Sequence, residues 1–69
     1  MNKFLEIAIK EGVSPALIQA KYGIGYVKSK EVVRTLKYMG IISREPFDDT
    51  HYALLDKDNF VGATEELIK

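Results

Sequence analysis

The chain has 69 residues, no cysteine, and ten basic against ten acidic residues, which gives a formal net charge of zero. A chain of this length predicts a single small domain, residues 1–69. The lack of cysteine excludes disulfides and thiolate metal sites, and no apolar run approaches the roughly 20 residues that cross a bilayer. We therefore expect a soluble cytoplasmic protein that does not contact membranes.

The neutral total conceals a segregation of charge along the chain. Residues 1–20 are balanced, residues 21–43 hold five basic residues against one acid, and residues 44–69 hold three basic residues against seven acids. A basic middle followed by an acidic tail predicts that one element faces a polyanion. A solvated helix face without a ligand is the structural alternative.

The first third of the sequence predicts two helices. Apolar residues at helical spacing within residues 4–9 form an amphipathic stripe, which Gly12 ends. Ser14 is expected to cap a short second helix over Pro15–Tyr22. Serine accepts a hydrogen bond from a free first-turn amide, and proline at the first position lacks the donor that would go unpaired there.

A third helix is predicted from about Gly25 to Met39, with Gly40 as its stop. Gly23 and Gly25 lack the third glycine of a dinucleotide loop and follow a helix, so they are expected to shape a turn rather than hold phosphate. At 100° per residue, the core side of this helix holds Tyr26, Ser29, Val32, Val33, Leu36 and Met39. The outer side holds Val27, Lys28, Lys30, Glu31, Arg34, Thr35 and Tyr38.

After Gly40 the apolar period changes from helical to β-like. Short strands are predicted at 41–43 and 51–55, joined by a polar turn over 44–50, which together form a β-hairpin. The predicted fold class is therefore mainly α with a small β-hairpin, in the order α-α-α-β-β-α. Three helices and a hairpin in this order make a winged helix-turn-helix.

A final amphipathic helix is predicted over about 59–68, capped by Asp58 or Asn59. Two roles are open for this helix: it closes the core, or it pairs two copies in a homodimer. Its candidate apolar positions are Phe60, Val61, Ala63, Leu67 and Ile68.

Three motifs follow one another between Ser14 and Ser43: a serine-capped helix ending in Q-x-x-Y, then I-G-Y, then M-G-I-I-S. In this order they resemble the C-terminal gamma domain of the FtsK/SpoIIIE family of bacterial DNA translocases. The likeness extends over about 3–55 and leaves out the last helix. The matching residues are Ser14, Leu17, Gln19, Tyr22, Ile24, Gly25, Tyr26, Val32, Val33, Leu36, Met39, Gly40, Ile41, Ile42 and Ser43.

The resemblance implies a winged helix that binds a short G-rich DNA sequence, orients chromosome translocation and contacts a tyrosine recombinase. The family follows I-G-Y with Asn-Arg-Ala-Ala-Arg, where this chain has Val-Lys-Ser-Lys-Glu. Lys28 keeps the positive charge of the first arginine, whereas Glu31 reverses that of the second. We therefore expect an altered sequence preference, because glutamate can accept from cytosine N4 and Val27 can pack on a thymine methyl.

Two functions from different classes follow from these patterns. The first is non-enzymatic binding of duplex DNA through the third helix, where Lys37 adds to the basic charge. The predicted DNA contacts are Val27, Lys28, Lys30, Glu31, Arg34 and Arg44.

The second function is a protein-interaction module or small dimeric regulator without strong DNA binding, which Asp48 and Asp49 favour because carboxylates repel phosphate. Its predicted partner surface includes Val27, Glu31 and Tyr38. Phe47 is a further predicted partner contact, and it could instead fold back on the core.

No enzyme, cofactor or metal is expected. His51 is the single histidine, and there is no cysteine to complete a nucleophilic pair. Asp48, Asp49 and His51 could in principle hold a metal ion, but a polar turn with two acids is more often solvated. The start Met1-Asn2-Lys3 and the additional last helix favour a free-standing small protein, and an excised domain is the alternative.

Overall fold

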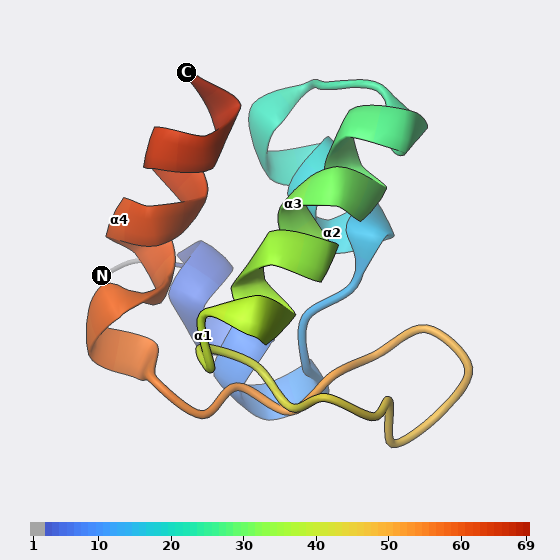
Figure 1. The fold of residues 1–69 in the computed structure, drawn as a ribbon, viewed down its shortest axis with the longest axis vertical. Helices are drawn as coiled ribbons and strands as arrows, with labels where there is room; N and C mark the ends of the chain where they lie inside the picture. The colour runs from blue at the N-terminus through green and yellow to red at the C-terminus, as the bar shows by residue number, and fades with distance from the viewer. Residues whose placement is uncertain (1–2) are drawn as a thin grey trace.

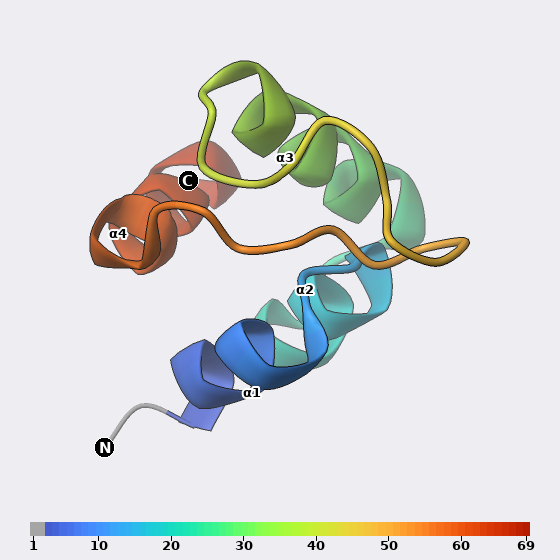
Figure 2. The same ribbon diagram turned by 90° about the horizontal axis from the view of Figure 1, so that it is seen from below.

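The computed structural model describes residues 3–69, so Met1 and Asn2, and with them most of the expected natural start, lie outside the described residues. Within residues 3–69 the chain forms four helices: α1 (Lys3–Glu11), α2 (Pro15–Tyr22), α3 (Tyr26–Tyr38) and α4 (Lys57–Ile68) (Figure 1). α3 packs against α2 and α4, and α4 also contacts α1. Figure 2 shows α1 on the side of the molecule opposite to α3. No helix within residues 3–69 is long and apolar enough to cross a membrane.

The predicted start and end of α2 are confirmed. The Ser14 hydroxyl accepts a hydrogen bond from the Leu17 amide at 3.2 Å, and Pro15 occupies the first turn. Gly23 ends the helix with φ 65° and ψ 32°, a left-handed conformation that favours glycine. The short turn through Gly25 then leads directly into α3, so local sequence chemistry fixes how the two helices are joined.

The core side of α3 is only partly as predicted. Val32, Val33 and Leu36 are buried. Tyr26 and Met39, however, are 54% and 53% exposed, so their assignment to the core is wrong. Tyr26 lies at the edge of the apolar arc in the first turn, and Met39 follows the last helical residue, so neither side chain is directed into the core.

The predicted β-hairpin, and with it the winged α-α-α-β-β-α order, is wrong. No strand forms within residues 3–69, and the chain between α3 and α4 is an irregular loop. Its extended pairing is limited to two isolated antiparallel bridges, Ile42 with Leu54 and Tyr52 with Val13. We call residues 41–56 the long loop.

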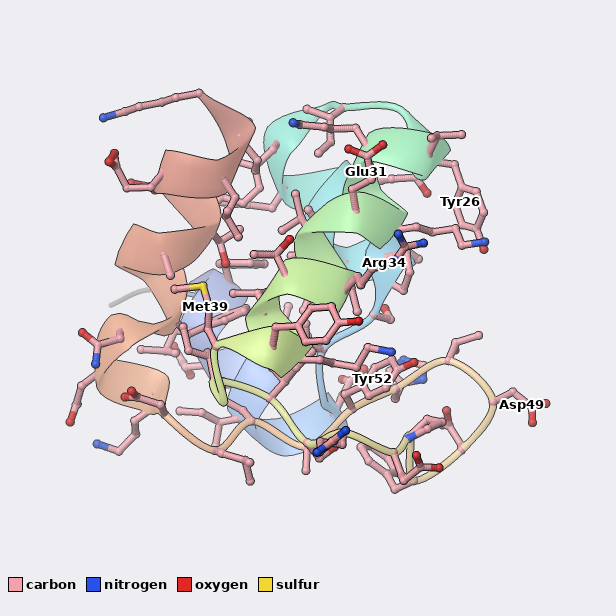
Figure 3. The ribbon with its side chains drawn as sticks, in the orientation of Figure 1. Tyr26, Glu31, Arg34, Met39, Asp49 and Tyr52 are labelled. Carbon is pink, nitrogen blue, oxygen red and sulfur yellow. The ribbon has the colours of Figure 1, made fainter. Side chains whose placement is uncertain are left out.

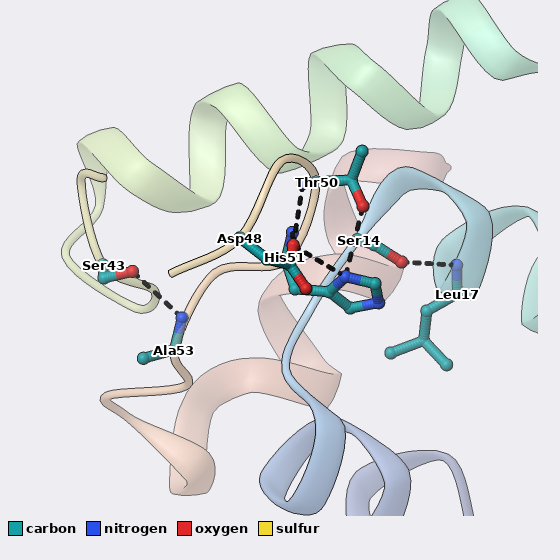
Figure 4. A network of polar contacts seen from close by, with 7 residues as sticks. All are labelled: Ser14, Leu17, Ser43, Asp48, Thr50, His51 and Ala53. Carbon is teal, nitrogen blue, oxygen red and sulfur yellow. Dashed lines mark hydrogen bonds and ion pairs between the residues drawn. The ribbon is translucent and has the colours of Figure 1, made fainter. Parts of the chain in front are cut away.

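A side chain takes the place of a backbone hydrogen-bond partner, which explains why no regular β-ladder forms between the two predicted strands. The Ser43 amide donates to the Ala53 carbonyl at 2.9 Å, as in a hairpin, but the Ala53 amide donates to the Ser43 hydroxyl at 3.0 Å rather than to a backbone carbonyl (Figure 4). Tyr52 exchanges both of its backbone hydrogen bonds with Val13, in the α1–α2 link, at 2.8 and 2.9 Å. Tyr52 therefore pairs outside the predicted hairpin, whereas Leu54 keeps its partner Ile42 within it.

The last helix begins earlier than predicted and closes the core. Asp56, rather than Asp58 or Asn59, is the cap, because its carboxylate accepts from the Asn59 amide at 3.2 Å. The Phe60 ring is fully buried and stacks on Phe4 with 5.2 Å between ring centroids. The buried apolar core consists of Phe4, Ala8, Val13, Ile18, Val32, Val33, Leu36, Ile41, Ile42 and Phe60.

Candidate nucleic-acid interface

The outer side of α3 is a basic surface. All six side chains predicted to contact DNA are exposed: Val27, Lys28, Lys30, Glu31, Arg34 and Arg44. Val27 is 72% exposed, which is high for an aliphatic side chain in the middle of a small domain. Exposure leaves these side chains accessible, while their role in binding stays a prediction.

One side of α3 borders a groove that we call the central groove, about 330 Å³ in volume. Lys30, Arg34 and Lys37 line it because residues spaced by four and seven positions share a helix face. The other lining residues are Pro15, Tyr26, Val33, Asp49, Thr50 and Tyr52. Figure 3 shows Tyr26, Arg34 and Tyr52 along this side of α3.

Two tyrosines position the lysines of the central groove. The Lys30 ammonium lies 5.5 Å from the centroid of the Tyr26 ring. The Lys37 ammonium lies 4.8 Å from the centroid of the Tyr52 ring and donates to its hydroxyl at 3.3 Å. A cation over an aromatic face is attracted by the ring quadrupole, so these contacts hold positive charge at the groove without neutralising it.

A second groove, which we call the end groove, lies at the C-terminal end of α3 and has a volume of about 550 Å³. Arg34 and Lys37 line both grooves, so these two side chains lie between the central groove and the end groove. Arg44 joins them from the long loop. The remaining lining residues are Tyr38, Gly40, Ile42, Glu45 and Leu55.

The basic side chains of α3 form no ion pairs within the described chain. The ion pairs found among residues 3–69 are His51–Asp48, Lys57–Asp58 and Lys69–Glu66, all outside α3. Arg44 is likewise absent from them. The charge of this surface is therefore available to an external anion.

The carboxylates of the long loop are arranged differently from one another. Asp48 accepts hydrogen bonds from the backbone amides of Thr50 at 2.9 Å and His51 at 2.8 Å, and contacts the His51 ring at 3.1 Å (Figure 4). Donation from the Thr50 amide, followed by that from His51, lowers the pKa of the Asp48 carboxyl below its ordinary value. Asp49 instead borders the central groove, and Figure 3 shows it at the tip of the loop.

These contacts bear on the metal alternative. Asp48 and His51 lie together, but in the part of the chain that the structure describes no group of three or more histidine, aspartate or glutamate side chains is arranged to hold a metal ion. Asp48 uses its charge to fold its own turn. Residues 48–51 of the long loop therefore form a polar turn that is held by its own hydrogen bonds.

The structure brings some predicted site residues together and separates others. Lys30 and Arg34 share the central groove, and Arg34 meets Arg44 in the end groove. Val27, Lys28 and Glu31 line neither groove. Tyr38, 84% exposed, borders the end groove.

Phe47 has both features that the sequence left open. Its ring lies over Gly12, since a Cβ built on Gly12 would come within 2.7 Å of two Phe47 ring carbons, yet the side chain is 61% exposed. It therefore lies away from the two basic grooves, against the end of α1.

Sequence reasoning missed the two groove tyrosines. Tyr26 was predicted in the core and Tyr52 in a strand. A signal for Tyr26 was present, because it precedes Lys30 by four residues and so shares its helix face. Tyr52 had no comparable signal, since its position depends on pairing with Val13.

Comparison of the chain with protein-family models, with curated proteins and with solved structures finds no match. The resemblance to the gamma domain of DNA translocases therefore stays a prediction.

Proposed function

We propose that this chain is a non-enzymatic binder of duplex DNA and that α3 makes the contact. The observation that supports the proposal is the row of cations Lys30, Arg34 and Lys37 along one side of α3, none of which is paired with a carboxylate in residues 3–69. Lysine and arginine on the surface of a helix are the usual partners of DNA phosphates. Arg44 extends the row from the long loop.

The spacing of these cations suits a DNA strand. Lys30 and Lys37 are seven residues apart, which is about 10 Å along a helix at 1.5 Å per residue. The phosphates of one DNA strand wind around the duplex axis and rise about 3.4 Å each along it, so a straight row of about 10 Å is long enough to reach more than one of them. The two lysines are held by Tyr26 and Tyr52, which reduces the entropy lost when phosphate binds.

The sequence preference in this proposal depends on Val27 and Glu31, which project from α3 outside both grooves. Glutamate can accept a hydrogen bond from cytosine N4, and valine can pack on a thymine methyl. Glu31 cannot donate to guanine, so the proposed preference differs from the G-rich target that the resemblance implies. The family that the chain resembles acts on bacterial chromosomes, which lie in the cytoplasm, and we propose that compartment for the protein.

The test is a titration of fluorescently labelled duplex DNA at two salt concentrations. Four phosphate contacts, at about −0.9 each, give an expected slope near −3.6 for the logarithm of affinity against that of salt. Between about 50 and 200 mM salt the affinity should therefore fall roughly 100-fold. Absence of binding at the lower salt concentration would overturn the proposal.

A protein-interaction module without strong DNA binding is the second candidate. Tyr38 on the outer side of α3 favours it, because an aromatic ring this exposed is typical of interface residues. Phe47, against the end of α1, would be a separate contact. This candidate, which includes the recombinase partner implied by the resemblance, expects no salt-dependent DNA binding in the same titration.

A further inference from the structure

Three large apolar side chains are exposed together at the C-terminal end of α3. Tyr38, Met39 and Leu55 each expose more than half of their side-chain surface. Tyr38 and Leu55 line the same groove, Met39 follows Tyr38 in the chain, and the Ile41 carbonyl, which accepts from the amides of Leu55 at 2.8 Å and Asp56 at 3.1 Å, ties the two segments together. We call these three side chains the apolar centre.

Two grooves of opposite charge flank the apolar centre. The end groove contains Arg34, Lys37 and Arg44 against the single acid Glu45. A further groove, which we call the acidic groove, lies between the end of α3 and α4. It is lined by Met39, Ile41, Asp56, Asp58, Asn59, Gly62, Ala63 and Glu66, with no basic residue among them. Two of its acids are ion-paired with lysines that do not line the groove, Asp58 with Lys57 at 3.5 Å and Glu66 with Lys69 at 3.1 Å. Such pairs between exposed side chains are weak, so both carboxylates can exchange partners.

The chain itself forms the boundary between the two grooves. Tyr38 and Leu55 border the end groove, whereas their chain neighbours Met39 and Asp56 border the acidic groove. Figure 3 shows Met39 on the α4 side of α3 and Arg34 on the side of the long loop. The surface therefore runs from positive through apolar to negative.

A surface with this order is complementary to itself. In a two-fold symmetric pair, the two copies are related by a rotation of 180° about an axis through the apolar centre. This rotation places the end groove of each copy against the acidic groove of the other, so two equivalent contacts between opposite charges form. The apolar centres of the two copies would then meet on the axis. We propose that a second copy of this chain docks here, forming a homodimer across the apolar centre.

The small size of the proposed dimer interface limits the affinity that we expect. Standard interfaces bury about 800 Å² per partner. The whole surface of this chain is 4539 Å², so an interface of that size would use a large fraction of it. A contact limited to three apolar residues and two charged grooves is smaller, and we expect a Kd on the order of 100 µM.

The test is sedimentation velocity without DNA, over concentrations from about tenfold below to tenfold above that Kd. The wild-type chain is expected to shift from monomer to dimer across this range. A chain that stays monomeric throughout would overturn the proposal. Because no DNA is present, the result does not depend on the proposed function.

Charge-reversal variants make the test specific to this surface. Arg44→Glu places like charges opposite the acidic groove, and Glu66→Lys does the same opposite the end groove, so each variant alone should weaken dimerisation at least tenfold. Mixing the two variants should restore near wild-type affinity, because their heterodimer pairs opposite charges in both places. Both residues are exposed, so folding should survive, which circular dichroism checks.

Lys10→Glu, on α1, is the matched control. It makes the same charge change as Arg44→Glu on the side of the molecule opposite to α3, and should leave dimerisation unchanged (Figure 2). If the mixed variants stay monomeric, or if Lys10→Glu weakens the dimer as much as Arg44→Glu does, the proposed interface is wrong.

Discussion

The side chain of Lys37 joins α3 to the long loop through Tyr52. Its ammonium lies 4.8 Å from the centre of the tyrosine ring and 3.3 Å from the hydroxyl oxygen. The backbone of Tyr52 is paired with Val13 in the link between α1 and α2. One tyrosine thus connects the basic helix, the long loop and the start of the helix pair.

The contact between Lys37 and Tyr52 predicts how two substitutions of Tyr52 change the stability of the protein. Tyr52→Phe keeps the ring and removes the hydroxyl, so the free energy of unfolding should fall by no more than about 1 kcal/mol. Tyr52→Ala also removes the half-buried ring and should cost about 2 kcal/mol. Urea unfolding followed by circular dichroism measures both. Equal losses for the two variants would show that the ring contributes nothing.

Gly12 and Gly62 should respond oppositely to alanine. Gly12 has φ 93°, and a Cβ there would meet the Phe47 ring at 2.7 Å, so Gly12→Ala should lower the unfolding free energy by about 1–3 kcal/mol. Gly62 lies inside α4 with open space around it, so Gly62→Ala should raise that free energy by up to about 1 kcal/mol. Thermal unfolding at low protein concentration compares the two, and a stabilising Gly12→Ala would contradict the observed backbone.

Phe60 tests whether α4 is part of the core. The side chain is fully buried against Phe4, and deleting a buried aromatic side chain typically costs 3–5 kcal/mol, about as much as a small domain has. Phe60→Ala should therefore unfold the protein at room temperature, whereas Phe60→Leu should fold with a lowered melting temperature. Circular dichroism distinguishes these outcomes. A folded Phe60→Ala variant would mean that α4 is dispensable.

The turn held by Asp48 should depend on pH. Backbone donation from Thr50 and then His51 lowers the pKa of the Asp48 carboxyl from its ordinary value of 3.8. A depressed pKa gives a contribution that is present above 3.8 and is lost as pH falls through the lower folded value. The amide proton shifts of Thr50 and His51 in an NMR titration should therefore change with a midpoint below 3.8.

Two variants identify the carboxyl group that causes this titration. Asp48→Asn should abolish the acidic transition of the two amides, and Asp49→Asn should leave it in place, because the amides of Thr50 and His51 donate to Asp48 and not to Asp49. A midpoint at or above the ordinary value of 3.8 would show that the turn does not stabilise the carboxylate.

The helices could be predicted from the sequence because their signals are local. Ser14 with Pro15 begins α2, Gly23 ends it, and the apolar spacing of α3 places Val33 and Leu36 in the core. Each of these signals involves residues within one or two turns of one another. Tertiary contacts did not have to be known.

The long loop could not be predicted in full because one of its backbone partners, Val13, is distant in sequence and a side chain replaces another. Residues 51–55 have the composition of a strand, but Tyr52 pairs with Val13, and the Ser43 hydroxyl takes the amide of Ala53. β-propensity describes a fit to a pleated surface and does not identify the partner. The grooves beside α3 depend on this loop, so Tyr52 and the lining of both grooves were also beyond sequence reasoning.

The proposed function depends on the binding of DNA phosphates by Lys30, Arg34 and Lys37. The most direct measurement is the salt dependence of duplex DNA affinity for the wild-type chain and for Lys30→Ala with Arg34→Ala. Each phosphate contact contributes about −0.9 to the slope, so the double variant should have a slope shallower by about 1.8. Lys57→Ala with Lys69→Ala, at the start of α4 and just after its end, removes the same charge and should keep the wild-type slope. Equal slopes for the wild-type chain and the Lys30→Ala, Arg34→Ala variant would contradict the claim.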